Sequence, residues 1–150
     1  MNRLLILPIL ALAACDMPAV DAPVAEETTV IPAMTLPPPP APPRSARTAD
    51  QFDTTSAAER QAATQVSAAA TAELGRTTAT LGSPTEPGIW LKTPLVTAVT
   101  QGRIRYQSRT INVELRPSGG AAGSGSQISL AAMRLIEAPL TGIIDLTVLR

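Results

Sequence analysis

Apolar and polar residues alternate along two short segments in the C-terminal half of the chain, 103–106 and 111–116. Because successive side chains of a β-strand point to opposite faces, this alternation predicts two strands, each with one buried face. Residues 107–110 would join these strands as a hairpin. The expected inner face consists of Ile104, Tyr106, Ile111, Val113 and Leu115.

Short strands and turns are expected throughout 78–150. An apolar run begins at Ile89, between turns rich in glycine and proline, and 144–148 alternates as a last strand. Glycine and serine dominate 117–126, which predicts a flexible loop. The expected fold class is therefore mostly β with one or two short helices, and 78–150 is expected to form a small β-barrel-like domain.

Two segments have the signals of helices. A capping-box pattern begins at Ser56 and is followed by alanines at helical spacing, so we expect an alanine-rich helix over 56–77, with Gly75 as its stop. This helix would be half exposed or would contact a partner; a connector without contacts is the alternative. Ser129 predicts the N-cap of a second, shorter helix that ends before Pro139.

Proline dominates the segment before the first helix. Residues 16–55 hold nine prolines and only scattered aliphatic residues, so they offer no material for a core. Proline favours the extended polyproline II conformation, in which forty residues would reach on the order of 120 Å. We therefore expect 15–55 to be a disordered proline-rich tether. Docking of its proline run in an aromatic groove of a partner is the alternative.

The first fifteen residues have the pattern of an export signal. Arg3 precedes an apolar run over 4–14. A helix that spans a bilayer needs ~20 apolar residues, so this run is too short to span one and indicates a secretory signal. The run ends in Leu12-Ala13-Ala14-Cys15, which resembles the lipobox of bacterial lipoproteins. The resemblance implies a signal peptide over 1–14, cleavage between Ala14 and Cys15, and acylation of Cys15, for example with palmitate. An ordinary signal peptide that happens to abut a cysteine is the alternative.

Several acyl chains on one residue give stable membrane anchoring. The expected location is therefore the bacterial cell envelope, with the chain anchored by its lipid and facing the periplasm. Aspartate at position 16 favours the inner membrane in enterobacteria, but other bacteria follow that rule poorly, so the choice of membrane stays open.

Composition excludes several chemistries. The chain has no histidine and one cysteine, so neither a Ser-His-Asp triad, a Cys-His pair nor an imidazole zinc site is possible. No metal site and no cofactor are expected. Twelve basic and twelve acidic residues give a net charge of zero, which argues against nucleic-acid binding. The charge is uneven: 16–55 has a net charge of −4 and 56–150 a net charge of +3.

The candidate ligand-binding residues are Trp90, Lys92, Arg103 and Arg105. The two arginines belong to a local basic patch that could contact an anionic wall polymer, a lipid or an acidic partner; solvated charges that protect strands from aggregation are the alternative. Trp90 beside Lys92 could stack on a sugar, or it could belong to the core. The carboxylates after residue 56 are dispersed, so no catalytic residue is expected.

Three segments resemble the double-psi β-barrel of the rare lipoprotein A family. They are Gly102-Arg103-Ile104-Arg105-Tyr106, Ile111-Asn112-Val113-Glu114-Leu115 and the stretch from Gln127 to Leu135. The resemblance implies a small double-psi-like barrel and an envelope lipoprotein associated with septal peptidoglycan. Some members of that family are lytic transglycosylases. Their catalytic loop aspartate would fall at Pro117, which implies binding without glycan cleavage.

A second resemblance covers Leu81-Gly82, Trp90 to Val96 and Ala138 to Gly142. These segments are similar to a group of small alphaproteobacterial lipoproteins whose members are often labelled D-galactarate dehydratase. The label implies a much larger metal-dependent enzyme with imidazole ligands, which this chain lacks.

Together these features predict a lipid-anchored periplasmic protein that binds or organises peptidoglycan or an envelope protein without catalysis. The alternative is an enzyme, either a degenerate wall-glycan lytic transglycosylase or a D-galactarate dehydratase. A lone carboxylate would then carry the chemistry, with Glu114 and Asp145 as the candidates. A third possibility is a structural subunit that packs against a larger complex through its alanine-rich helix.

Overall fold

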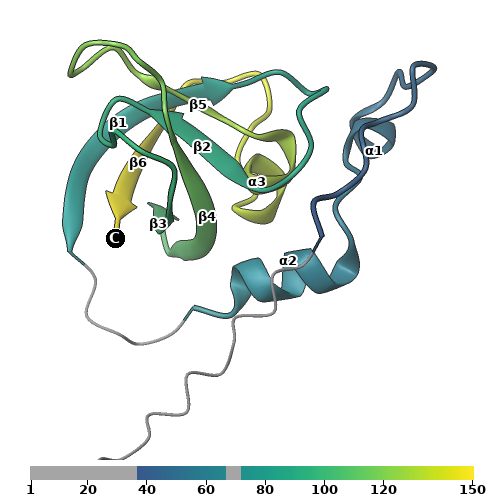
Figure 1. Cartoon of the computed structure of the whole chain (residues 1–150), viewed down its shortest axis with the longest axis horizontal. Coiled ribbons are helices and arrows are strands. Elements are labelled where there is room, and N and C mark those ends of the chain that lie inside the picture. The colour runs from purple at the N-terminus through teal and green to yellow at the C-terminus, as the bar shows by residue number, and fades with distance from the viewer. Residues whose placement is uncertain (1–36, 67–71) are drawn as a thin grey trace, which may run out of the picture. The chain divides into compact units, whose positions relative to one another are not determined.

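The computed structural model describes residues 37–66 and 72–150. The predicted signal peptide, with Ala14 and Cys15, and the first part of the predicted tether lie outside the described residues. The elements in chain order are α1 (Ala49–Phe52), α2 (Ala57–Thr64), β1 (Glu73–Leu81), β2 (Trp90–Thr93), β3 (Thr100–Tyr106), β4 (Arg109–Pro117), β5 (Ser126–Ile128), α3 (Leu130–Leu135) and β6 (Ile144–Leu149) (Figure 1). Within 37–66 and 72–150, no helix has the length and apolarity needed to cross a bilayer.

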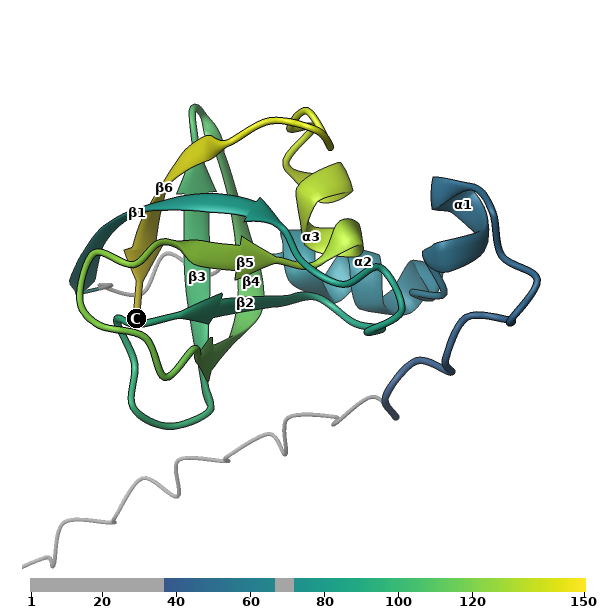
Figure 2. The same ribbon diagram turned by 90° about the horizontal axis from the view of Figure 1, so that it is seen from above.

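The strands form a closed barrel in the order β1-β5-β2-β4-β3-β6 (Figure 2). Two neighbouring pairs, β1–β5 and β2–β4, are parallel, and the others are antiparallel. Exchanging β1, β2 and β3 with β4, β5 and β6 leaves the order and every pair direction unchanged. This internal twofold relation is that of a double-psi-like barrel, so the predicted fold class is confirmed for the described residues.

The predicted hairpin is β3–β4, and its inner face is the predicted one. Ile104, Ile111, Val113 and Leu115 are buried, and Tyr106 is partly buried. The connection is shorter than expected, because Tyr106 already pairs with Arg109 and only two residues lie between them. The first of these, Gln107, has a positive φ of 51°, which lets the chain reverse within so short a turn.

The barrel interior is filled by aliphatic side chains, as the scarcity of aromatic residues predicts. Met133 of helix α3 and its C-cap residue Ile136 belong to this core. Ser129 caps the start of that helix as predicted, because its Oγ accepts a hydrogen bond from the Ala132 amide at 3.3 Å. The largest fully buried aliphatic residues are Leu91, Ile104, Leu115, Ile128, Met133, Ile136 and Leu146.

The prediction of an alanine-rich helix over 56–77 is wrong for 65–66 and 73–77, while 67–71 lie outside the described residues. The capping box at Ser56 is present, but α2 ends at Thr64, and β1 begins at Glu73. The first part of β1, up to Ala79, pairs with β6, and 79–81 pair with β5. A strand here closes the barrel and satisfies backbone groups on both sides, whereas an alanine face would bury only methyl groups. Gly75 lies in this strand, beside a bulge, rather than at a helix stop.

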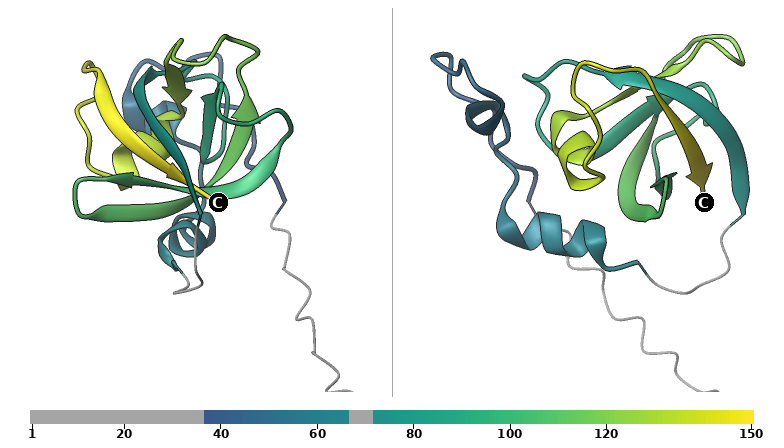
Figure 3. Two further views of the ribbon diagram at one scale, coloured as in Figure 1. Left: turned by 90° about the vertical axis from the view of Figure 1, so that its left-hand side faces the viewer. Right: turned by 180° about the vertical axis from the view of Figure 1, so that it is seen from behind.

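The expectation that 15–55 is only a tether is wrong for its last part. We call 37–66 the strap, because hydrogen bonds and ion pairs connect it to the barrel. Ala46 and Thr55 are buried, α1 lies within the predicted tether, and α2 packs against β4 (Figure 3). The Asn112 amide on β4 donates to two carbonyls at the end of α2, those of Ala62 at 3.1 Å and Gln65 at 2.9 Å. The strap has few apolar residues, so polar contacts hold it against the barrel.

Candidate functional site

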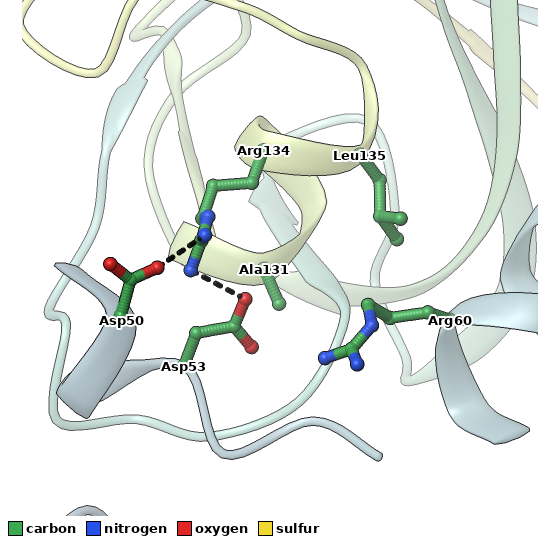
Figure 4. A pocket seen from close by; sticks show the side chains of 6 residues that line it. All are labelled: Asp50, Asp53, Arg60, Ala131, Arg134 and Leu135. Carbon is green, nitrogen blue, oxygen red and sulfur yellow. Dashed lines mark hydrogen bonds and ion pairs between the residues drawn. The ribbon is translucent and has the colours of Figure 1, made fainter. Parts of the chain in front are cut away.

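A polar cavity of about 390 Å³ lies where the strap meets α3 (Figure 4). We call it the strap pocket. The strap supplies three charged side chains to it, and α3 supplies one charged and two apolar ones. Its lining residues are Asp50, Asp53, Arg60, Ala131, Arg134 and Leu135.

Arg134 connects the two acids of the strap pocket. Its Nη2 lies 2.6 Å from Asp50 Oδ1, and its Nη1 lies 3.1 Å from Asp53 Oδ2. Asp50 lies in the first turn of α1 and Asp53 caps the end of the same short helix, so both carboxylates face one guanidinium. The two differ in burial, because the side chain of Asp53 is 6% exposed and that of Asp50 is 82% exposed.

Both oxygens of Asp53 already accept hydrogen bonds within the protein. Its Oδ1 accepts hydrogen bonds from the amide of Thr55 at 3.2 Å and from the Thr55 hydroxyl, while Oδ2 accepts from Arg134. A buried carboxylate with hydrogen bonds at both oxygens is held in one position. Asp53 therefore builds the wall of the strap pocket rather than acting on a ligand.

Arg60 has fewer partners than Arg134, the other guanidinium of the strap pocket. Its Nη1 donates to the carbonyl of Thr55 at 2.6 Å, its side chain is exposed, and it forms no ion pair within the described chain. A guanidinium carries five N–H donors, so most of its donors remain for a ligand. Figure 4 shows the guanidinium of Arg60 across the pocket from Asp50, pointing toward the side where Asp53 and Ala131 lie. This arrangement suits recognition of a carboxylate.

Trp90 is fully buried, so the expected stacking face for a sugar is absent. Neighbouring residues of a strand point to opposite sides, and here Leu91 joins the barrel core while Trp90 lies outside it. Two cations cover the indole: Lys92 Nζ lies 4.9 Å and Arg116 Cζ 5.3 Å from the ring centroid. The indole Nε1 donates to the carbonyl of Glu86 at 3.4 Å.

The predicted basic patch is interleaved with acids from other elements. Arg105 lies 3.9 Å from a carboxylate oxygen of Glu73, although the two residues are distant in the sequence. Arg103 lies partly buried on the same strand. The other pairs are Arg109–Glu137 at 2.5 Å, Arg116–Glu114 at 2.5 Å, and Glu86 with Lys92 at 2.8 Å and with Arg116 at 3.9 Å.

The four predicted ligand-binding residues do not form one site. Trp90 and Lys92 lie on β2, whereas Arg103 and Arg105 lie on β3, and β4 separates these strands in the barrel. None of the four lines the strap pocket.

The candidate carboxylates of the enzyme alternative are also apart. Glu114 lies on β4 and is ion-paired to Arg116, while Asp145 is exposed on β6, and these two strands are not neighbours. Among the described residues, no three acidic, cysteine or histidine side chains are grouped as a metal site would require.

Comparisons with known proteins add no assignment to this geometry. No protein-family model, no curated protein and no solved structure matches the chain. The assignment of a function therefore rests on the residues of this chain alone.

Proposed function

We propose that the chain is a lipid-anchored protein of the bacterial envelope whose strap and barrel form a non-catalytic binding module facing the periplasm. Cys15 carries the lipid after cleavage behind Ala14, and the proline-containing residues that follow connect it to the strap. The lipobox-like sequence supports the anchor. A binding module, rather than an enzyme, is supported by the strap pocket.

The binding role is inferred from one observation: the charged side chains of the strap pocket differ in how fully their hydrogen-bonding groups are engaged. Arg134 engages both acids, and Asp53 is used at both oxygens, whereas Arg60 retains most of its donors. An acid–base site needs a carboxylate free to exchange a proton with substrate. A pocket whose two acids are both held by Arg134, and whose Arg60 keeps free donors, instead favours binding a charged ligand without proton transfer.

Two further features favour the cell wall as the target. Residues 56–150 carry a net charge of +3, which suits an anionic polymer such as peptidoglycan. Pro117 ends β4, opposite Thr93, at the position where the rare lipoprotein A family would have its catalytic acid. A barrel of that kind without the acid would bind the wall without cutting it. An envelope protein partner is the other candidate target.

Co-sedimentation with purified peptidoglycan sacculi tests this function. The full-length chain in detergent micelles should pellet with sacculi at low salt and less at moderate salt, because exposed charges are screened. Replacing Arg103 and Arg105 together with alanine should reduce the pelleted fraction. A folded chain that stays in the supernatant at low salt contradicts wall binding. Release of soluble glycan fragments from the sacculi contradicts a non-catalytic role.

A further inference from the structure

We infer that the strap pocket binds a short peptide with free amino and carboxyl ends, holding the carboxylate at Arg60 and the ammonium at Asp50. This inference rests on the proposed function and deepens it, because it names the chemical class that the binding module takes. It depends on three features of the pocket: its unused charges, its apolar floor and its construction from two separate parts of the chain.

The unused charges in the strap pocket are one positive and one negative. Arg134 is occupied by both acids, and Asp53 is occupied by Arg134 and Thr55. What remains is the guanidinium of Arg60 and the second oxygen of Asp50, whose side chain is 82% exposed. A ligand with one charge would meet an attractive and a repulsive partner, whereas a zwitterion satisfies both.

The apolar lining fits small aliphatic side chains. Ala131 is buried and Leu135 partly buried; Figure 4 shows Ala131 between Asp53 and Arg60, and Leu135 on the side of Arg60. A cavity of about 390 Å³ is within the range of ~300–1,000 Å³ that holds small molecules. A charged amine, a charged carboxylate and small methyl-bearing side chains together describe a short alanine-rich peptide.

The construction of the pocket links binding to strap docking. Asp50 and Arg60 belong to the strap, whereas Ala131 and Leu135 belong to α3, so the pocket exists only while the strap is docked. A ligand that binds only the docked form stabilises that form by mass action. Bound peptide should therefore slow hydrogen exchange in α2, which an adventitious contact elsewhere on the surface would not do.

Calorimetric titration of the full-length chain in detergent micelles tests the inference with three probes. Trialanine carries both charges, N-acetyl-trialanine lacks the ammonium, and trialanine amide lacks the carboxylate. Trialanine should bind, and each blocked probe should bind up to about five-fold more weakly, because each loses one contact with an exposed charged side chain. Trialanine should also slow exchange of the α2 amides.

Arg60→Gln should weaken trialanine binding by a similar factor. Arg47→Gln is the matched control, because Arg47 also donates from Nη1 to backbone carbonyls, those of Ala46 at 2.8 Å and Arg44 at 3.3 Å, but does not line the pocket. Because Arg60 also donates to the Thr55 carbonyl, Arg60→Gln could weaken binding by loosening the strap. The Asp50→Asn variant is therefore a second test that leaves Arg60 in place. It should remove the discrimination against N-acetyl-trialanine while leaving the need for the carboxylate.

Equal binding of the three probes, or unchanged binding by Arg60→Gln, overturns the inference. Absence of trialanine binding also overturns it; if sacculi still pellet the chain in that case, the proposed function stands and only the peptide site fails. Trialanine binding with the expected selectivity, but without binding to sacculi, supports the peptide site and removes the wall from the proposed function.

Discussion

Replacing Asp53 with asparagine should weaken strap docking much more than the same change at Asp50. Both carboxylates accept a hydrogen bond from Arg134, but the side chain of Asp53 is 6% exposed and that of Asp50 is 82% exposed. Water competes for the exposed pair, so Asp50 should contribute about 0.2–1 kcal/mol. A hydrogen bond to a charged group with little water around it contributes about 1.5–3 kcal/mol. An asparagine at position 53 would place its NH2 donor against either the donors of Arg134 or the backbone amide of Thr55.

Native-state hydrogen exchange of α2 measures this difference. The amides of Arg60 and Gln65 donate to Ser56 and Gln61 carbonyls at 3.1 Å, and an isolated helix of this length is unstable in water, so their protection reports strap docking. Asp53→Asn should raise the opening equilibrium about ten- to a hundred-fold and Asp50→Asn less than about five-fold. Amides of the β3–β4 hairpin should be unchanged in both variants. Equal effects of the two substitutions on α2 would refute the argument from burial.

Three more substitutions or probes test other parts of the structure. Asn112→Ala removes both hydrogen bonds to the end of α2 and should ease strap opening by about 1–2 kcal/mol in the same exchange experiment, with the barrel unaffected. Gly102→Ala would place its Cβ 2.8 Å from Leu115 Cγ and from the backbone oxygen of Leu149, so urea unfolding should show about 1–3 kcal/mol of destabilisation; unchanged stability would disprove the close packing. Trp90 is the only tryptophan and is fully buried, so its native fluorescence should resist acrylamide quenching, whereas strong quenching would place it at the surface.

Elements with large aliphatic residues at regular spacing could be predicted from the sequence. The β3–β4 hairpin and α3 are such elements, because Ile104, Ile111 and Met133 mark their buried faces locally. Strand β5 could not be found, because it has only three residues and its place depends on pairing with β1 and β2. The residues of β1 include few large aliphatics and follow an alanine-rich run. Nothing in the local sequence therefore marks the change from helix to strand, and the predicted helix extends into β1 in error.

The strap pocket could not be predicted, because its parts are distant in the sequence. Arg134 is 84 residues from Asp50 and 81 from Asp53. The spacing of three between those acids hints at a shared partner, but nothing in the sequence selects Arg134. Burial of Trp90 was one of its two interpretations, but its cover by Arg116 of the neighbouring strand could not be predicted.

Intact mass spectrometry of the full-length chain, extracted from the membranes of a Gram-negative host, tests the lipid anchor most directly. The mature chain should begin at Cys15 and carry the added mass of a diacylglycerol and an amide-linked acyl chain. The Cys15→Ser variant, as matched control, should keep residues 1–14 and gain no lipid. A wild-type chain that retains residues 1–14, or that begins at Cys15 with an unmodified thiol, would contradict the account.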